Sequence, residues 1–201
     1  MRTIAALSLV AALSIFESVR GADAPLDPEK AITELQALKG KIKLEGKLAV
    51  GANLADIDIQ DSGLVFLEAL PQLKTLTLRH GYKVTPAGLD HLKGLKQLET
   101  LDVWDLKKGV NDKSLATLVA MLPQLKNLDI GGCPVTDAGL TCLAELKGLE
   151  SLVLTYTNVT DAGIEQIVKL KTLKKLAVNI TKITPAGVEK LKAALPQCKI
   201  N

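Results

Sequence analysis

The sequence predicts a single α/β solenoid, in which short parallel strands form one curved sheet and short helices cover its other side. Three observations predict this fold. A unit of about 24 residues recurs along most of the chain. Each unit starts with the apolar pattern of a short strand and continues with apolar residues at helical spacing. Apolar residues make up 47% of the 201 residues but aromatics only 2%, as expected when one core residue type is copied with the unit.

Six units follow one another at nearly constant steps, and we number them units 1 to 6. The steps between their first residues are 24, 25, 27, 24 and 24 residues. A truncated seventh copy, "CKIN", begins at Cys198. One unit cannot bury its own leucine face, so neighbouring units must stack into a continuous core. The units start at Ala49, Leu73, Leu98, Leu125, Leu149 and Leu173.

Unit 5 illustrates the expected local structure. Leu152 and Leu154 alternate with polar residues, which predicts a short strand with one buried face. After a turn, Val159 returns to the core. Ile164 and Ile167 then have the spacing of one helical face. Each unit therefore contributes one strand to the sheet and one short helix to its other side.

The segment "TDAG" combines a hydroxyl, a carboxylate and a glycine, yet its recurrence predicts a scaffold role. Units 2 and 6 carry Pro86 and Pro185 where other units have Asp. Since proline is favoured at the first helical position, we expect Thr to be the N-cap and Asp or Pro the first helical residue. Asp137 and Asp161 would then lie at the positive end of the helix dipole. A carboxylate that alternates with proline within one chain is not expected to be catalytic.

A small residue recurs two positions after this Asp or Pro, and it predicts close packing between units. Glycine inside a first helical turn is unfavourable by up to about 1 kcal/mol, so its recurrence needs a steric reason. We expect each helix to begin in contact with the neighbouring unit. The positions are Gly63, Gly88, Ser114, Gly139, Gly163 and Gly187.

These units resemble the leucine-rich repeat family. The resemblance rests on segments such as "LKNLDIGGCPVTDAGLTCL" and "LESLVLTYTNVTDAGIEQI", and it covers residues 49–201. Units with "VTDAGL" are similar to the cysteine-containing-type repeats and their relatives in exported bacterial proteins. The resemblance implies a parallel sheet on the concave side and helices on the convex side. It also implies a binding scaffold, because proteins of this family bind many unrelated partners.

The N-terminus has the pattern of a secretory signal peptide. Arg2 precedes an unbroken apolar run, "IAALSLVAALSIF", at residues 4–16, and polar residues follow. We expect cleavage after Gly21, or as late as residue 24. The run is too short to span a bilayer in the mature protein. The sequence therefore predicts an exported protein, periplasmic or extracellular, and a buried N-terminal helix is the alternative.

Residues 22–48 are predicted to form a linker and an N-terminal cap. Asp27-Pro28 is a favourable helix start and Gly40 a favourable stop. The following "KIKLEGKLAV" alternates around Glu45-Gly46, which predicts a β-hairpin. The repeat domain then spans residues 49–201, with six units and a truncated terminal strand. Its short, lysine-bearing last strand disfavours pairing with another chain, so we expect a monomer.

Composition and motifs argue against several functions. Without residues 1–21 the chain has 23 basic and 21 acidic residues, with Arg79 as its one arginine, so nucleic-acid binding is not expected. Three cysteines at irregular spacing predict buried thiols rather than disulfides. The chain lacks the common catalytic and metal-binding motifs, and we expect no enzyme activity, cofactor or metal. Asp56, Asp58 and Asp61 suggest a calcium loop, but Leu67 takes the place of the required final Glu.

The concave face of the sheet, called the sheet face below, is the predicted binding surface. Strand side chains alternate, so the non-leucine strand positions point there. The one Trp and the one Arg of residues 22–201 fall on these positions, and such side chains dominate binding hot spots. The alternative is that Trp104 packs over the lengthened loop of unit 3. The candidate binding residues are Arg79, His80, Asp102, Trp104, Asp105, Thr155 and Tyr156.

We therefore expect a non-enzymatic, exported module that binds a protein or peptide on the sheet face. A glycan is an alternative ligand. Two other functions stay open, a structural surface protein without a specific ligand and an adaptor like the leucine-rich-repeat substrate receptors of ubiquitin ligases. Asn158-Val159-Thr160 and Asn179-Ile180-Thr181 match the N-glycosylation pattern and would matter only in a host that glycosylates.

Overall fold

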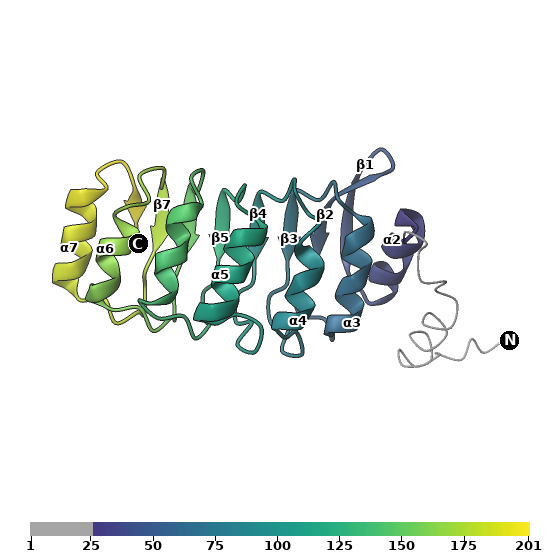
Figure 1. The fold of residues 1–201 in the computed structure, drawn as a ribbon, viewed down its shortest axis with the longest axis horizontal. Coiled ribbons are helices and arrows are strands. Elements are labelled where there is room, and N and C mark those ends of the chain that lie inside the picture. Colours follow the sequence, from purple (N-terminus) through teal and green to yellow (C-terminus); the bar gives the residue numbers. More distant parts are fainter. Residues whose placement is uncertain (1–25) are drawn as a thin grey trace, which may run out of the picture.

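The computed structural model of the protein describes residues 26–201. The predicted signal peptide lies outside the described residues. Eight strands form one sheet in chain order, β1 to β8. Figure 1 shows strands following one another along the length of the molecule. The predicted α/β solenoid is confirmed. The strands are β1 (Lys41–Glu45), β2 (Leu48–Asn53), β3 (Thr75–Thr77), β4 (Thr100–Asp102), β5 (Asn127–Asp129), β6 (Ser151–Val153), β7 (Lys175–Ala177) and β8 (Lys199–Ile200).

All strand pairs from β2 to β8 are parallel, and each strand is in register with the equivalent strand of the next unit. Leu101 lies opposite Leu76 on one side and opposite Leu128 on the other. These middle residues are fully or almost fully buried, whereas the residues before and after them point to the sheet face. The alternation that predicted a strand with one buried face is therefore correct.

The helices all lie on one side of the sheet (Figure 1). Within the described residues, only the N-terminal cap, unit 3 and unit 6 contain a helix of ten residues, and the other units use one or two short helical turns, often 3₁₀. The predicted helices are therefore present but mostly shorter than a regular α-helix. They are α2 (Pro28–Ala37), α3 (Asp61–Leu64), η1 (Val65–Ala69), α4 (Pro86–Leu89), η2 (Asp90–Leu92), α5 (Asp112–Met121), η3 (Gly139–Glu145), η4 (Asp161–Gly163), α6 (Ile164–Ile167) and α7 (Pro185–Ala194).

One apolar core runs the length of the solenoid between strands and helices. It begins at Ala31 and Leu35 of α2 and ends at Leu191 and Leu195. Most of its members are leucines from equivalent positions of successive units. Such a core is continuous only because the units stack, as the repeat predicted.

The N-terminal cap has the predicted helix and hairpin. Asp27 accepts hydrogen bonds from the backbone N–H groups of Glu29 and Lys30, and Pro28 is the first helical residue. Strand β1 then pairs with β2 in antiparallel fashion. The hairpin turn is formed by Gly46 and Lys47, one residue later than expected, and Gly46 supplies the left-handed backbone at φ 62°.

Four aspartates connect neighbouring units next to the helix starts, and we call them the aspartate ladder. Asp137 Oδ1 accepts the backbone N–H of Thr160 at 2.8 Å, and Oδ2 accepts its hydroxyl at 2.7 Å. The other three make the same pair of bonds to the next unit. The sequence predicted that these aspartates stabilise the dipole of their own helix, and it did not predict this bond to the next unit. The pairs are Asp61–Thr85, Asp112–Thr136, Asp137–Thr160 and Asp161–Thr184.

The threonine hydroxyls cap helices in only some of the units. Thr160 accepts the backbone N–H of Ala162, and Thr184 accepts that of Gly187, as predicted for N-caps. Thr85 occupies the N-cap position, but its side chain accepts no capping hydrogen bond from the helix. In unit 4 the Thr136 hydroxyl accepts the backbone N–H of Ala138 in the same way, although the 3₁₀ helix is regular only from Gly139. The more regular function of these threonines is to donate to the ladder.

Unit 3 explains why proline can replace the ladder aspartate. Pro86 offers no carboxylate to the next unit, and that unit has Asn111 in place of threonine. Asn111 Oδ1 accepts the backbone N–H groups of Lys113 and Ser114 instead, and Ser114 Oγ accepts that of Asn111. This capping box satisfies the helix start within unit 3. The loss of one inter-unit contact is thus offset locally.

The recurring glycine is required by the ladder, which confirms the predicted crowding. A Cβ atom on Gly163 would collide with the Asp137 carboxylate and lie 2.8 Å from Leu140. Gly88, Gly139 and Gly187 face the preceding ladder aspartate in the same way. Unit 3 carries Ser114 here because Pro86 leaves that space free of a carboxylate.

Candidate functional site

The candidate site is a cluster on the sheet face built from units 2 to 5. We call Arg79, Asp102, Trp104, Asp129 and Tyr156 the sheet-face cluster. Asp102 and Asp129 are the last residues of β4 and β5 and lie side by side in the register. Arg79, Trp104 and Tyr156 come from the loops that directly follow β3, β4 and β6. Parallel stacking thus brings together residues up to 77 positions apart in the sequence.

Arg79 is held by two carboxylates. Its Nε donates to Asp102 Oδ2 at 2.6 Å, and its Nη2 donates to Asp129 Oδ2 at 3.1 Å. The other oxygen of each carboxylate accepts a backbone N–H two residues further on, from Trp104 and from Gly131. The carboxylates are therefore fixed by their own loops, and they fix the guanidinium in turn.

The charges of this group are not balanced, because one cation faces two anions. The hydrogen bond to Asp102 is the main cause that raises the pKa of Arg79 above its ordinary value. Burial raises the pKa of the Asp129 carboxyl, and the charge of Asp102 adds to it. The Gly131 N–H and Arg79 oppose that rise without cancelling it. Arg79 therefore compensates the burial of Asp129 only in part.

Trp104 lies across unit 4 instead of standing away from the sheet. The ring occupies the space that a Cβ atom of Gly131 would need. The guanidinium carbon of Arg79 is 5.2 Å from the indole centroid, and Tyr156 meets the indole edge-on with centroids 6.1 Å apart. These are cation–π and aromatic contacts of ordinary geometry. Gly131 therefore allows Trp104 to bridge Arg79 in unit 2 and Tyr156 in unit 5.

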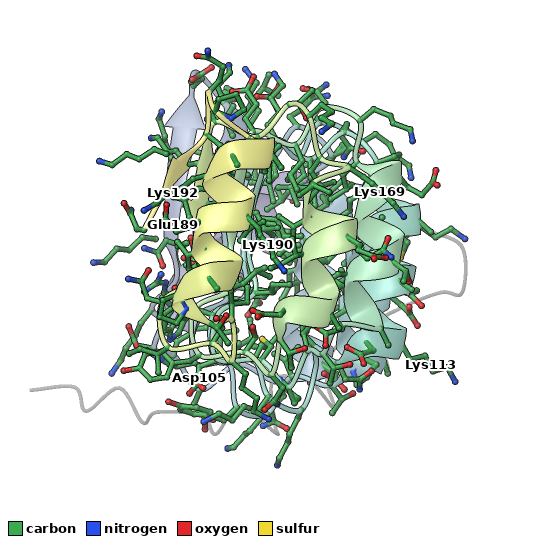
Figure 2. All side chains as sticks on the ribbon, turned by 90° about the vertical axis from the view of Figure 1, so that its left-hand side faces the viewer. Asp105, Lys113, Lys169, Glu189, Lys190 and Lys192 are labelled. Carbon is green, nitrogen blue, oxygen red and sulfur yellow. The ribbon has the colours of Figure 1, made fainter. Side chains whose placement is uncertain are left out.

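The other three predicted site residues do not join this cluster. His80 Nδ1 lies 2.6 Å from Asp56 Oδ1, and its ring stacks on Tyr82. Asp105 pairs with Lys107 at 2.9 Å, and Figure 2 places it at the loop edge of the stack. The Thr155 carbonyl accepts the N–H of Gly132. The structure thus divides the predicted set into a central cluster and flanking residues.

Sequence reasoning overlooked Asp129 and Gly131 as members of the site. Strand alternation places both on the sheet face, but neither carries an unusual side chain. Asp129 became important only through its pairing with Arg79, two units away. The signal for Gly131 was a pair of glycines, Gly131-Gly132, where other units have larger residues. A gap beside the one tryptophan could have indicated where the indole lies.

One residue in each unit has a left-handed backbone, and we call this set the corner row. The positions repeat with the same steps as the units, three residues after each sheet-face strand. In units 1 to 5 their N–H groups continue the hydrogen bonding between units, as when Asp105 donates to the Gly131 carbonyl at 2.7 Å. The φ angles are 59° at Asp56, 57° at His80, 58° at Asp105, 70° at Gly132, 61° at Tyr156 and 55° at Ile180.

Residues 26–201 contain no group of three or more His, Cys, Asp and Glu side chains placed to hold a metal ion. Asp56, Asp58 and Asp61, the considered calcium loop, bond instead to three different side chains, those of His80, Lys83 and Thr85. Across the same range, no helix has the length and apolar character to cross a bilayer.

The three cysteines are free, and their environments match unreactive thiols. Burial raises the pKa of Cys133 to about 12 and that of Cys142 to about 11. A thiol with such a pKa carries almost no thiolate at neutral pH, and the thiolate is the nucleophile. Only Cys133 is fully buried, so the prediction of buried thiols is correct for one cysteine, and the other two are half-exposed.

Comparison with known proteins agrees with the repeat architecture. A family model described as leucine-rich repeat matches residues 123–144 and 149–168, which run from the end of unit 3 through parts of units 4 and 5. Those segments contain the same leucine positions that are buried along the whole stack. The chain is a leucine-rich repeat protein. No curated protein sequence matches it significantly.

Solved structures share the fold of this leucine-rich repeat protein. An internalin from Listeria monocytogenes is 21% identical, with a TM-score of 0.54, over 76% of this chain and 47% of the internalin. The ectodomain of the Arabidopsis receptor kinase HAESA, solved with a peptide hormone ligand, is 17% identical with a TM-score of 0.53. That match covers 88% of this chain and 30% of the receptor chain. The chain thus spans less than half of either protein.

Proposed function

We propose that this leucine-rich repeat protein is an exported, non-enzymatic module that binds a protein or peptide on its sheet face. The observation that carries the proposal is the bridge of Arg79, Trp104 and Tyr156 across four units. Arginine, tryptophan and tyrosine are the side chains most enriched at binding hot spots. Here they are pre-positioned by Asp102, Asp129 and the gap at Gly131, which lowers the entropy that binding must remove.

The chemistry of the cluster suits a polypeptide ligand. Arg79 uses two of its N–H groups for the carboxylates, and a guanidinium has five. Its side chain is 40% exposed, so the remaining donors can meet peptide carbonyl groups. Tyr156 is 56% exposed and adds apolar contact area. The HAESA ectodomain, which has a similar fold, was solved with a peptide hormone. That precedent supports a peptide or protein partner for this chain.

Affinity capture tests this proposal. The purified protein is immobilised, exposed to extracellular and periplasmic extracts, and its bound proteins are quantified by mass spectrometry. A Trp104→Ala/Tyr156→Ala variant should lose at least tenfold of the specific partner. A Leu44→Ala/Leu48→Ala variant is the matched control, because it removes two exposed apolar side chains from the β1–β2 hairpin. Equal recovery by all three proteins would favour a structural role without a specific ligand.

Export has a separate test. N-terminal sequencing of protein recovered outside the cytoplasm should start at Ala22, or at a residue up to Pro25. Recovery of the protein only from the cytoplasm, with Met1 retained, would contradict export and revive the adaptor alternative. The capture experiment does not depend on this outcome, because the sheet face lies within the described residues.

A further inference from the structure

Two residues of the corner row do not fit their backbone. Gly132 adopts a left-handed conformation without steric strain, and Asp and His tolerate this conformation better than most residues. Tyr156 and Ile180 are bulky, and isoleucine is also β-branched, which makes it a strong outlier there. Units 5 and 6 therefore keep strained residues at positions that units 1 to 4 fill with suitable ones.

Burial does not compensate for this strain. Ile180 is 64% exposed, and Tyr156 is 56% exposed. The two residues occupy the same position in neighbouring units, and the Tyr156 N–H donates to the Asn179 carbonyl, so their backbones lie side by side along the edge of the sheet face. Trp104 reaches Tyr156 from the other side. Together the three side chains form an apolar stripe that continues the sheet-face cluster towards unit 6. Strained residues cluster at ligand-contact positions, so these two outliers support a binding hypothesis.

The polar residues of the cluster should distinguish between ligands by their charge. Arg79, Asp102 and Asp129 carry a net charge of −1 when ionised, although residues 22–201 as a whole carry a positive charge. An acidic group brought to this place would meet two carboxylates. A basic group would be attracted by Asp129, which Arg79 compensates incompletely. The surface therefore favours a cationic side chain at the cluster and an apolar one on the stripe.

We propose that the partner docks a polypeptide segment carrying a basic side chain against Asp102 and Asp129 and an apolar side chain against Tyr156 and Ile180. The inference rests on the proposed function and names the chemistry of its partner. It also assigns Ile180 to the binding surface. The two subsites lie a few strands apart, at roughly 5 Å per strand, so a short segment can reach both.

Peptide selection tests the inference directly. Phage-displayed random 12-residue peptides are selected on the purified protein and counter-selected on the Trp104→Ala/Tyr156→Ala variant. We expect the enriched peptides to carry a net positive charge and at least one aliphatic or aromatic residue. Peptides enriched in Asp and Glu would overturn the inference and leave the proposed function standing. If no peptide depends on Trp104 and Tyr156, both fail.

Two variants then locate the subsites with one selected peptide. Asp129→Asn should weaken binding at least threefold, while Asp90→Asn, an exposed aspartate on the helix side, should have no effect. Ile180→Asn should weaken binding at least tenfold and raise Tm by about 2–4 °C, because asparagine accepts the left-handed backbone. Leu48→Asn is the control for removing an exposed apolar side chain. Unchanged binding in both Asp129→Asn and Ile180→Asn would contradict the assignment.

Discussion

Aspartates serve two regions of this molecule in different ways. In the aspartate ladder, each carboxylate accepts two bonds from one threonine of the next unit, and the arrangement recurs almost unit by unit. In the sheet-face cluster, Asp102 and Asp129 share one arginine and occur once. The ladder repeats because the threonine N–H and hydroxyl groups at the junctions between units need a hydrogen-bond acceptor. The pairing with Arg79 does not repeat, so the stacking of the units does not require it. Within a repeat protein, departure from the period is the better guide to a binding surface.

The ladder should show the largest loss of stability. Asp137→Ala removes both bonds to Thr160 and leaves a helix-start N–H without its acceptor. We expect a loss of about 2–3 kcal/mol in the free energy of unfolding, as for charge-assisted hydrogen bonds. Urea unfolding followed by circular dichroism measures it. Asp90→Ala is the control, and a similar loss in that variant would mean that the ladder is not special.

The crowding at the ladder glycine should be next in size. Gly163→Ala places a methyl group against Asp137 and should cost about 1–3 kcal/mol. Gly148→Ala, where no atom lies within 4 Å of the added Cβ, should be neutral or slightly stabilising. In the Asp137→Ala background the Gly163→Ala change should cost much less. Strict additivity of the two changes would show that the carboxylate is not the source of the crowding.

Relief of strain in the corner row should be smaller and of opposite sign. Ile180→Gly lets unit 6 adopt the left-handed backbone without a Cβ penalty, and we expect a gain of about 1 kcal/mol. Part of that gain is lost because glycine makes the unfolded chain more flexible. Differential scanning calorimetry at pH 7 gives the sign. A clear loss of stability would mean that Ile180 packs usefully and is not strained.

The two kinds of aspartate should also differ in their response to pH. Hydrogen bonds from Thr184 lower the pKa of Asp161, so its contribution to stability is present above the unfolded pKa and is lost as pH falls through the folded value. Burial raises the pKa of Asp129, so stability there is lost as pH rises through its folded value.

Unfolding free energies between pH 3 and pH 7 test this difference. The disadvantage of Asp161→Asn should shrink towards low pH, and the relative stability of Asp129→Asn should improve as pH rises. Both effects should be small, since each involves one partly solvated group. Parallel pH profiles for the two variants would contradict the opposite assignment of their pKa shifts.

Much of the fold could be predicted from the sequence because the residue pattern of each structural feature recurs in several units. Leucines at equivalent positions gave the strands, their register and the core. Pro86 and Pro185 located the helix starts, and the recurring glycine indicated a crowded junction. The sequence also connects the proline with the glycine. Ser114 takes the place of glycine in unit 3, and the unit before it carries Pro86 in place of aspartate. This coincidence points to a contact from one unit to the next.

The candidate site was harder to predict because it depends on contacts between units. That Arg79, Trp104 and Tyr156 share one face followed from strand alternation. That Arg79 reaches Asp129, 50 positions away, depends on side-chain length and on the stacking geometry. The strain at Ile180 was not foreseen, because periodicity does not report the sign of φ. A left-handed position could have been suspected from Gly132, Asp56 and Asp105, which occupy the same place in other units.

The most direct test of this separation between scaffold and binding surface is the affinity of one selected peptide for three proteins. These are the wild type, Asp137→Ala, and Trp104→Ala/Tyr156→Ala, measured by fluorescence anisotropy at a temperature where all three are folded. We predict a Kd within threefold of wild type for Asp137→Ala, despite its lower stability. The double variant should bind at least 30-fold more weakly, as expected for loss of a hot spot. Equal affinities for the wild type and the double variant, or a loss confined to Asp137→Ala, would contradict the account.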